Sequence, residues 1–479
     1  MERASAEKVP ERAAELALAI AVLALVAAGV LARVWGLQTD FWLDEVWSYD
    51  LARGLRSPLE VLTRLHHSNN HHLNTLFLYL LGPDLPHWGW YRLLSLAAGI
   101  GSVALLARIA AERGRAEGWI AAVLGSCSYV LVFHSAEARG YALVVFFALL
   151  AYLQLATLLE QPTWRRGAVF GLTVVLGFLS HLQFVHVYGA AATWSLWRAL
   201  RSRDPMGTRL SALVRMHAVA LVLLAGLYWI DVRKLHVGGG PDYDVLQVLG
   251  STAALLFGVP SAGWLPFAAL ALAVGTAVAG IVQLARRGED VCVFHLVVIL
   301  LSPAILLAVA RPDVLFERYF ILSHVFLLLL LADLLAAAWR SNAASRAVAA
   351  VCLLAMFAGN GVLIARFLRD GSGRYLEALE FIASETPGPV ARVASDNDGR
   401  TSMMVDFYQR WLPAGERIDY VRQEQWPDSI QWVLVHSLTG EPPPDTTLSI
   451  ASERFDLARR FPRGSHAGWD WYLFRREEP

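Results

Sequence analysis

The sequence predicts an all-α protein that crosses a membrane many times and ends in a small α/β domain. Of its 479 residues, 56% are hydrophobic and only 17% are charged, and the mean hydropathy is +0.45. A soluble protein is nearer one quarter charged. Several apolar runs reach the ~20 residues that a helix needs to cross a bilayer. The formal net charge is zero, so nothing suggests a nucleic-acid partner.

About eleven membrane spans are expected. They cover residues 14–34, 91–110, 118–134, 141–159, 167–182, 184–198, 212–230, 263–284, 291–310, 319–338 and 346–366. The apolar stretch 72–82 is too short to span, so we expect a juxtamembrane or re-entrant helix there. The first run lacks a convincing cleavage site and is long enough to remain as a membrane helix.

The basic residues predict the orientation of these spans. With the N-terminus in the cytoplasm, the inner segments carry 17 Arg and Lys residues, whereas the longer outer segments carry 9. The positive-inside rule therefore places the N-terminus inside, and eleven spans place the C-terminus outside. We expect a multi-pass protein of the cell membrane, in a bacterium the inner membrane, with its site and its C-terminal domain extracytoplasmic.

The last 110 or so residues change character. Residues 1–368 are predicted to form the transmembrane domain, with a first outer loop at 35–90, and residues 369–479 a soluble α/β domain. In this second part Pro, Asp, Glu and Arg become frequent and the apolar runs shorten. The segments 374–385 and 400–411 are typical of helices, and four segments are typical of short strands: 389–395, 416–421, 430–436 and 469–475.

Two adjacent carboxylates, Asp44 and Glu45, follow the first span among aromatic residues. A carboxylate that loses hydration beside aromatic rings is suited to proton transfer. Neighbouring helical residues point about 100° apart, so the two acids are expected to have different partners. The simpler interpretation is that they cap a juxtamembrane helix and pair with Arg53 or Arg56.

A histidine-rich run follows in the same loop and opens the short apolar helix: His66-His67-Ser68-Asn69-Asn70-His71-His72-Leu73-Asn74. Imidazoles can bind a divalent metal or donate hydrogen bonds to a phosphate. The spacing fits no standard zinc pattern, and a solvated polar loop is an alternative. Cys127, Cys292 and Cys352 lie far apart in apolar stretches, so no disulfide framework and no thiolate metal site is expected.

Three further outer turns place ionisable groups beside apolar segments. Arg139 lies where a span begins, and an Arg at membrane depth needs an anionic partner, such as a lipid phosphate or Glu137. His181 lies in another short turn. Arg311-Pro312-Asp313 and Glu317-Arg318-Tyr319 precede a late span. The planar guanidinium suits a phosphate, although Arg318 could instead anchor the span at the interface.

Together these turns predict one polar chamber near the outer leaflet. Five separate outer segments bring His, Arg or carboxylate groups to the same membrane depth, whereas the cytoplasmic loops carry Arg but almost no His or paired acids.

The ordered set of motifs resembles GT-C fold glycosyltransferases, in particular the glycosyltransferase family 39 group of protein O-mannosyltransferases and aminoarabinose transferases. The pair Asp44-Glu45 resembles the family's Asp-Glu motif. Three later runs are similar to its Arg-x-Tyr-Ala-Leu, Thr-His-Tyr and Arg-Tyr motifs: Glu137-Ala138-Arg139-Gly140-Tyr141-Ala142-Leu143, Ser180-His181-Leu182 and Arg318-Tyr319-Phe320. Many relatives carry His-Pro-Pro or Lys-Pro-Pro where this chain has Asn70-His71-His72, without either proline. The resemblance covers about residues 14–340.

The resemblance implies a glycosyltransferase of the cell envelope that uses a polyprenyl-phosphate sugar donor and a glycan, lipid or protein acceptor, with inversion. Asp44 is then the general base, and Glu45 orients the acceptor, a neighbouring helix or a metal. Arg139 and Arg318 stabilise the departing phosphate, with His71 or His72 assisting. The other expected substrate-binding residues are Asn70, His181 and Tyr319. The resemblance leaves metal-assisted and metal-independent transfer both open, so a divalent metal is the one cofactor that it allows for.

Two other classes of function compete with this one. A lipid or glycolipid transporter or flippase would also bury ionisable groups, but would more often show repeat symmetry and broken helices near the midplane. A non-catalytic scaffold or receptor would have no need of Asp44, Arg139 and Arg318 together.

Overall fold

The computed structural model describes two compact units whose segments alternate along the chain. The helical unit comprises Met1–Val34, Leu55–Leu81 and Tyr91–Ile364, and the mixed unit comprises Trp35–Gly54, Gly82–Trp90 and Ala365–Pro479. The described residues are 2–235, 243–310, 313–426, 430–437, 445–450, 453–464 and 466–477. Arg311 and Pro312 therefore lie outside the described residues.

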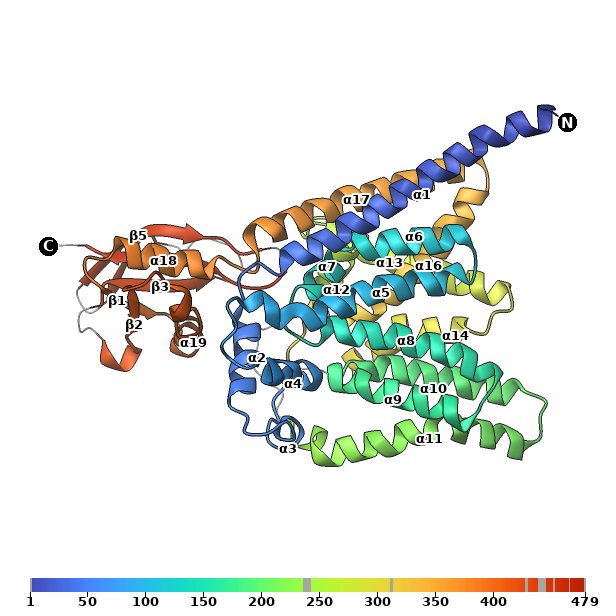
Figure 1. Ribbon diagram of the computed structural model, residues 1–479, viewed down its shortest axis with the longest axis horizontal. Coiled ribbons are helices and arrows are strands. Elements are labelled where there is room, and N and C mark those ends of the chain that lie inside the picture. The colour runs from blue at the N-terminus through green and yellow to red at the C-terminus, as the bar shows by residue number, and fades with distance from the viewer. Residues whose placement is uncertain are drawn as a thin grey trace. The chain divides into compact units, whose positions relative to one another are not determined.

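Long apolar helices joined by short turns build the helical unit. Helix α5 packs against α6 and α8, and α9 packs against α8 and α11 (Figure 1). The helices are α1 (Glu2–Gly36), α3 (Glu60–Thr63), α4 (His72–Leu81), α5 (Leu93–Ala111), α6 (Arg115–Cys127), α7 (Tyr129–Ser135), α8 (Tyr141–Glu160), α9 (Trp164–Ser180), α10 (Phe184–Arg201), α11 (Met206–Ile230), α12 (Val245–Phe257), α13 (Leu265–Arg286), α14 (Cys292–Leu296), α15 (Ser302–Ile305), α16 (Ile321–Arg340) and α17 (Ala343–Asp370). Two π-helical segments, η3 (Val297–Leu301) and η4 (Leu306–Ala310), continue α14 and α15.

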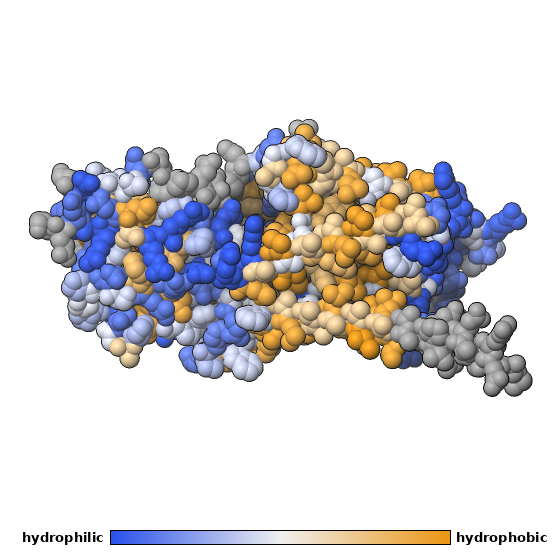
Figure 2. All heavy atoms as spheres, turned by 90° about the horizontal axis from the view of Figure 1, so that it is seen from above, coloured by the Kyte–Doolittle hydropathy of each residue, from blue (hydrophilic) through white to orange (hydrophobic). Residues whose placement is uncertain are grey.

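Eight helical segments in the described part of the chain are long and apolar enough to cross a membrane, and the bent pair α6 and α7 makes a ninth. Figure 2 shows hydrophobic residues over the middle of the helical unit and hydrophilic residues gathered at one end. The chain therefore has the helices of a multi-pass membrane protein. Each of the eleven predicted spans coincides with helix, but 167–182 and 184–198, which are α9 and α10, fall outside this set. The count of eleven stays a prediction.

The predicted span 118–134 is interrupted. Helix α6 ends at Cys127, Ser128 is extended, and α7 leaves at a bend of 59°. The buried guanidinium of Arg33 on α1 donates to the carbonyls of Gly125 and Ser126, at 2.8 Å each. On α17, Asn360 Oδ1 accepts from the backbone N–H of Tyr129 at 2.8 Å. Side chains of two other helices therefore satisfy backbone groups that the break leaves open, as a low-dielectric environment requires.

A six-stranded mixed sheet forms most of the mixed unit, in the order β2-β1-β3-β6-β5-β4. The strands are β1 (Val390–Ser395), β2 (Arg417–Tyr420), β3 (Trp432–Ser437), β4 (Thr447–Ile450), β5 (Glu453–Phe461) and β6 (Asp470–Arg476). Strand β1 pairs in parallel with β2 and β3, whereas β6 pairs antiparallel with β3 and β5. The four strands expected from the sequence are present, and β4 and β5 were not expected.

Both faces of the sheet are covered by packed side chains. On one face Trp432 stacks edge-on against Phe381 and donates from its indole nitrogen to Thr386 Oγ1, which fixes α18 (Tyr375–Glu385). Helix α19 (Asp398–Tyr408) contacts the same part of the sheet at β1 and β2. On the other face an apolar cluster joins the strands: Ala394, Val421, Ile430, Val433, Phe455, Tyr472 and Phe474. The C-terminal part is thus the small α/β structure that the sequence predicts.

Two segments of the first outer loop belong to the mixed unit, namely 35–54 with α2 (Leu43–Arg53) and 82–90. The structure thus groups 35–54 and 82–90 with residues 365–479. The predicted division of the chain into two domains at residue 368 stays a prediction.

Candidate functional site

The acid pair lies in the first turn of α2, within the mixed unit. Glu45 is fully buried, and its Oε2 accepts a hydrogen bond from the backbone N–H of Trp42 at 3.4 Å. This contact closes the start of the helix, as the simpler interpretation of the sequence foresees for one of the two acids. Asp44 is partly exposed, and its backbone carbonyl accepts from Ser48 Oγ.

In the helical unit, the histidine-rich run is anchored to the end of α11. Asp231 is buried and accepts from two imidazoles: Oδ1 lies 2.7 Å from His66 Nδ1, and Oδ2 lies 2.8 Å from His72 Nε2. Asn70 is turned to its own loop, since its Nδ2 donates to the carbonyls of Val61 and Leu65. Asp231 is absent from the sequence-based prediction. A carboxylate that ends an apolar helix on the predicted outer side is the signal that could have revealed it.

His71 and His181 come together from segments that are 110 positions apart. Their rings stack with centroids 4.9 Å apart and an interplanar angle of 28°. Tyr141, at the start of α8, lies against both rings, at 5.5 Å and 4.8 Å. His71 Nε2 is buried and has no hydrogen-bond partner among the described residues. A buried ring nitrogen in this condition is open to a water or a ligand atom.

Arg139 lies in the turn between α7 and α8 and is 4% exposed. Its Nη2 donates to Asn69 Oδ1 at 2.8 Å, and its guanidinium lies over the ring of Tyr141 at 5.0 Å. The next residue, Gly140, is required by the packing, because a Cβ there would collide with the carbonyl of Ser180 and touch Cβ of His71 at 3.1 Å. This close approach brings the Arg139 turn against the His181 turn.

Arg318 and Tyr319 belong to the 3₁₀ turn η5 (Glu317–Phe320) before α16. The guanidinium of Arg318 lies over the ring of Phe316 at 4.0 Å, and its backbone carbonyl accepts from Gln183 Nε2 at 3.2 Å. Gln183 follows His181 in the same turn. The late turn at 317–320 and the turn at 181–183 are therefore in direct contact.

Burial and the charges of Arg139 and Arg318 all lower the pKa of His71 and His181. Burial lowers the pKa of His71 well below its ordinary value, and the charges of Arg139 and Arg318 lower it further. Burial lowers the pKa of His181 to about 3, with the same two arginines contributing. Both imidazoles are therefore neutral at physiological pH, and the positive charge of the group resides on the two arginines.

Another pair close to this group is His134 and Glu137, whose Nδ1 and Oε2 atoms lie 2.6 Å apart. The His134 ring also lies 4.7 Å from that of Tyr141. Four residues that the sequence predicts for the chamber are thus in one neighbourhood: His71, Arg139, His181 and Arg318. Tyr319 follows Arg318 in the same turn, and its ring lies 5.8 Å from that of Phe316. His72 and Asn70 flank this neighbourhood and make the anchoring contacts described above.

Within the part of the chain that the structure describes, no group of three or more His, Cys, Asp or Glu side chains is arranged to hold a metal ion. His66, His72 and Asp231 hydrogen-bond directly to one another instead.

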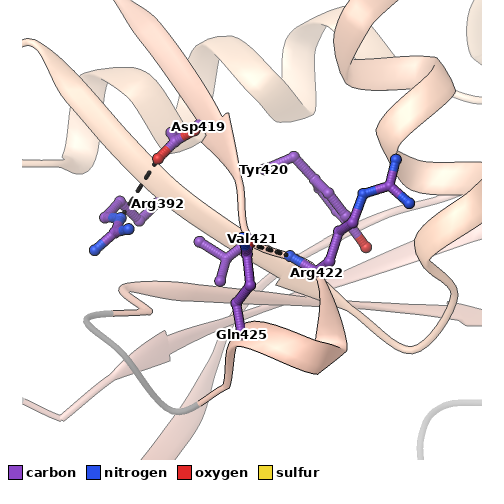
Figure 3. Close-up of a pocket in the computed structure, with 6 residues that line it drawn as sticks. All are labelled: Arg392, Asp419, Tyr420, Val421, Arg422 and Gln425. Carbon is purple, nitrogen blue, oxygen red and sulfur yellow. Dashed lines mark hydrogen bonds and ion pairs between the residues drawn. The ribbon is translucent and has the colours of Figure 1, made fainter.

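A pocket of about 520 Å³ lies in the mixed unit, and none of the predicted site residues lines it. Figure 3 shows Arg392 and Asp419 facing each other across it, with N–O atoms 3.5 Å apart. Its other lining residues are Tyr420, Val421, Arg422 and Gln425. Arg392 and Asp419 pair with each other, and none of the lining residues belongs to the histidine and arginine cluster.

Comparison with known proteins yields a distant structural likeness. No family model and no curated protein sequence matches the chain. Among solved structures, the chain is similar to the Archaeoglobus fulgidus oligosaccharyltransferase in its complex with Zn and sulfate, at 12% identity and a TM-score of 0.47. The alignment covers 86% of this chain and 68% of that one. A likeness of this size does not establish a shared fold or activity, so the contacts of this chain carry the functional argument.

Proposed function

We propose that the protein is a membrane glycosyltransferase that moves a sugar from a polyprenyl-phosphate donor to an acceptor hydroxyl outside the cytoplasm. The observation that carries the proposal is geometric: the turns that carry Arg139 and Arg318 both pack against the segment of the stacked pair His71 and His181. Two guanidinium groups and imidazole N–H donors supply the positive charge and the hydrogen-bond donors that a phosphate requires.

A lipid-linked phosphate fits this position better than a soluble one. The surface of the helical unit is hydrophobic in its middle (Figure 2), so a polyprenyl tail can remain in the bilayer. The charged group lies in turns at helix ends, where the phosphate of such a lipid would lie.

The proposed reaction is an inverting displacement at the anomeric carbon. The acceptor oxygen forms a bond to that carbon while the bond to the phosphate oxygen breaks. The electron pair of the broken bond goes to the phosphate, where Arg139 and Arg318 stabilise the growing negative charge. The acceptor proton goes to the carboxylate of Asp44, the proposed general base.

Several features support Asp44 as the base. Only six residues join the end of α1 to the start of α2, which limits how far Asp44 can lie from the outer end of that span. It is partly exposed in a first helical turn, whereas Glu45 is buried and holds that turn. We therefore assign Glu45 a positioning role.

The remaining candidates are assigned to holding the turns of the cluster. His72 and Asn70 hold the loop that carries His71, and Tyr319 belongs to the turn of Arg318.

The break between α6 and α7 favours the alternative of a lipid transporter, because transporters often carry discontinuous helices. Here, however, Arg33 and Asn360 occupy the backbone groups that such a break offers to an ion or substrate. A transporter would also leave the sugar attached to its lipid.

The test is transfer of radiolabelled sugar from a lipid extract to acceptor material in membranes that contain the protein. We expect Asp44→Asn to lower transfer by at least about 100-fold, the loss typical of a removed general base. Asp84→Asn, an exposed acid of the same outer loop, is the matched control and is expected to retain activity. Near-normal transfer by Asp44→Asn would contradict the base assignment, and translocation of intact donor without transfer would favour the transporter.

A further inference from the structure

Helix α2 is packed into the C-terminal part of the chain by a set of aromatic contacts. Phe41, directly before the helix, is fully buried and stacks on Phe407 of α19, with centroids 5.3 Å apart and planes 4° from parallel. Tyr49, two turns into α2, meets the edge of the same Phe407 ring at 5.2 Å. One ring of α19 therefore touches the chain on both sides of the acid pair.

A hydrogen bond fixes the same segment. Tyr408 is fully buried, and its hydroxyl donates to the backbone carbonyl of Phe41 at 2.8 Å. Its ring also lies edge-on to Trp88, 5.6 Å away, and the Trp88 indole donates to the carbonyl of Thr39 at 2.8 Å. Phe41 is three residues from Asp44, so this bond holds the backbone just before the first turn of α2.

Two more contacts reach the segment from other parts of the mixed unit. The carboxylate of Asp40 accepts from the backbone N–H of Leu376 at the start of α18, at 2.8 Å. Arg410 donates to the carbonyl of Pro83 at 2.8 Å, and Tyr49 donates to the same oxygen at 3.2 Å. The segment 39–49 is thus held by α18, by α19 and by the loop 82–90.

We propose that the C-terminal domain acts as the positioning element for the acid pair, with Phe407 and Tyr408 as the residues that set the first turn of α2. For its catalytic consequence, this inference rests on the proposed transferase function. Because the stacked ring and the hydrogen bond are made by neighbouring residues of one helix, a shift of α19 would carry Phe41 and the start of α2 with it.

Hydrogen exchange tests the positioning without relying on activity. Tyr408→Phe keeps the ring and removes only the hydroxyl, so we expect faster exchange of the amides of residues 40–47 in the detergent-solubilised full chain. Tyr420→Phe is the matched control, because both hydrogen bonds of its hydroxyl, to Ser395 and Asp398, stay among residues 395–420. Unchanged exchange at 40–47 in Tyr408→Phe would overturn the inference.

Kinetic measurements test whether this positioning of the acid pair affects the rate of sugar transfer. Tyr408→Phe is expected to lower kcat about fivefold, with the KM for the donor unchanged, because a backbone hydrogen bond is lost away from the phosphate group. Phe407→Leu is expected to act in the same direction, and Tyr420→Phe to leave kcat unchanged. Normal kcat in both Tyr408→Phe and Phe407→Leu would overturn the catalytic part. A wild-type protein without transfer activity would instead defeat the proposed function, while the exchange result would still decide the positioning.

Discussion

Burial changes the acid–base behaviour of one carboxyl in α2. It raises the pKa of Asp50 from 3.8 to about 6; Arg53 and Arg410 act in the opposite direction, and Asp406 adds to the rise. Asp50 lies on the same helix as the acid pair. Its protonation therefore affects the stability of the element that carries Asp44.

The sign of this effect follows from linkage. The folded state holds the proton more tightly than the unfolded state, so the contribution to the free energy of unfolding is fully present below about pH 4 and is lost as the pH rises to about 6. We expect Asp50→Asn to flatten the pH dependence of thermal unfolding between pH 4 and 7. Asp84→Asn should leave that dependence unchanged. An equally steep dependence in Asp50→Asn would contradict the raised pKa.

The sequence singles out candidate residues where a polar group stands at the start of an apolar helix. Arg139, His181 and Arg318 were identified in this way, and the structure brings them to His71. The sequence is a weaker guide to which polar side chains hydrogen-bond to each other. His72 was expected to assist at the phosphate, yet it hydrogen-bonds Asp231, 159 positions away. Such pairings depend on tertiary packing, which local pattern does not encode.

At the scale of elements, the break between α6 and α7 is the least predictable feature. The run 118–134 has the composition of one span, and the serines at its centre give only a weak signal. What makes the break tolerable is distant in sequence: Arg33 lies more than 90 positions from the carbonyls that it binds. Gly29 contributes as well, because a Cβ there would collide with the carbonyl of Ser126.

We expect Arg33→Met to destabilise the protein by about 3 kcal/mol, because it leaves buried carbonyls of α6 without donors. The measurement is thermal unfolding in detergent. Arg108→Met is the matched control, since that arginine is exposed and pairs with Glu112 one turn away. Equal effects of the two substitutions would show that Arg33 does not hold the break.

The sequence-based prediction also missed the strands β4 and β5. Strand β5 pairs with β6, but its register shifts between Leu457 and Arg459. A bulge interrupts the alternation of apolar and polar residues on which strand prediction depends. The other four strands were expected from the sequence.

At the scale of the whole molecule, the composition predicted a multi-pass membrane protein with a small C-terminal α/β structure. It did not predict that 35–54 and 82–90 fold with residues 365–479. The contacts responsible, such as Tyr408 with Phe41, join residues 367 positions apart. Hydrophobic periodicity reports on the local environment of a segment and carries no information about such partners.

The orientation predicted by the basic residues can be measured on a cysteine-free background. A cysteine at position 414, as Ala414→Cys, is expected to react with a membrane-impermeant maleimide in intact cells, because the C-terminal part is predicted to lie outside. Arg203→Cys, in the exposed turn between α10 and α11, is expected to react only after permeabilisation. The reverse pattern would place the histidine and arginine cluster on the cytoplasmic side.

The central claim is that Arg139 and Arg318 bind the phosphate of a lipid donor. Its most direct test is the affinity of the protein in nanodiscs for polyprenyl phosphate, the donor without its sugar. We expect Arg318→Gln and Arg139→Gln each to raise the Kd at least about tenfold, the loss typical of a charge-assisted hydrogen bond to an anion. Arg233→Gln, an exposed arginine at the end of α11, and Asp44→Asn are expected to bind like the wild type. Equal affinity in the wild type and in both Arg139→Gln and Arg318→Gln would contradict the account.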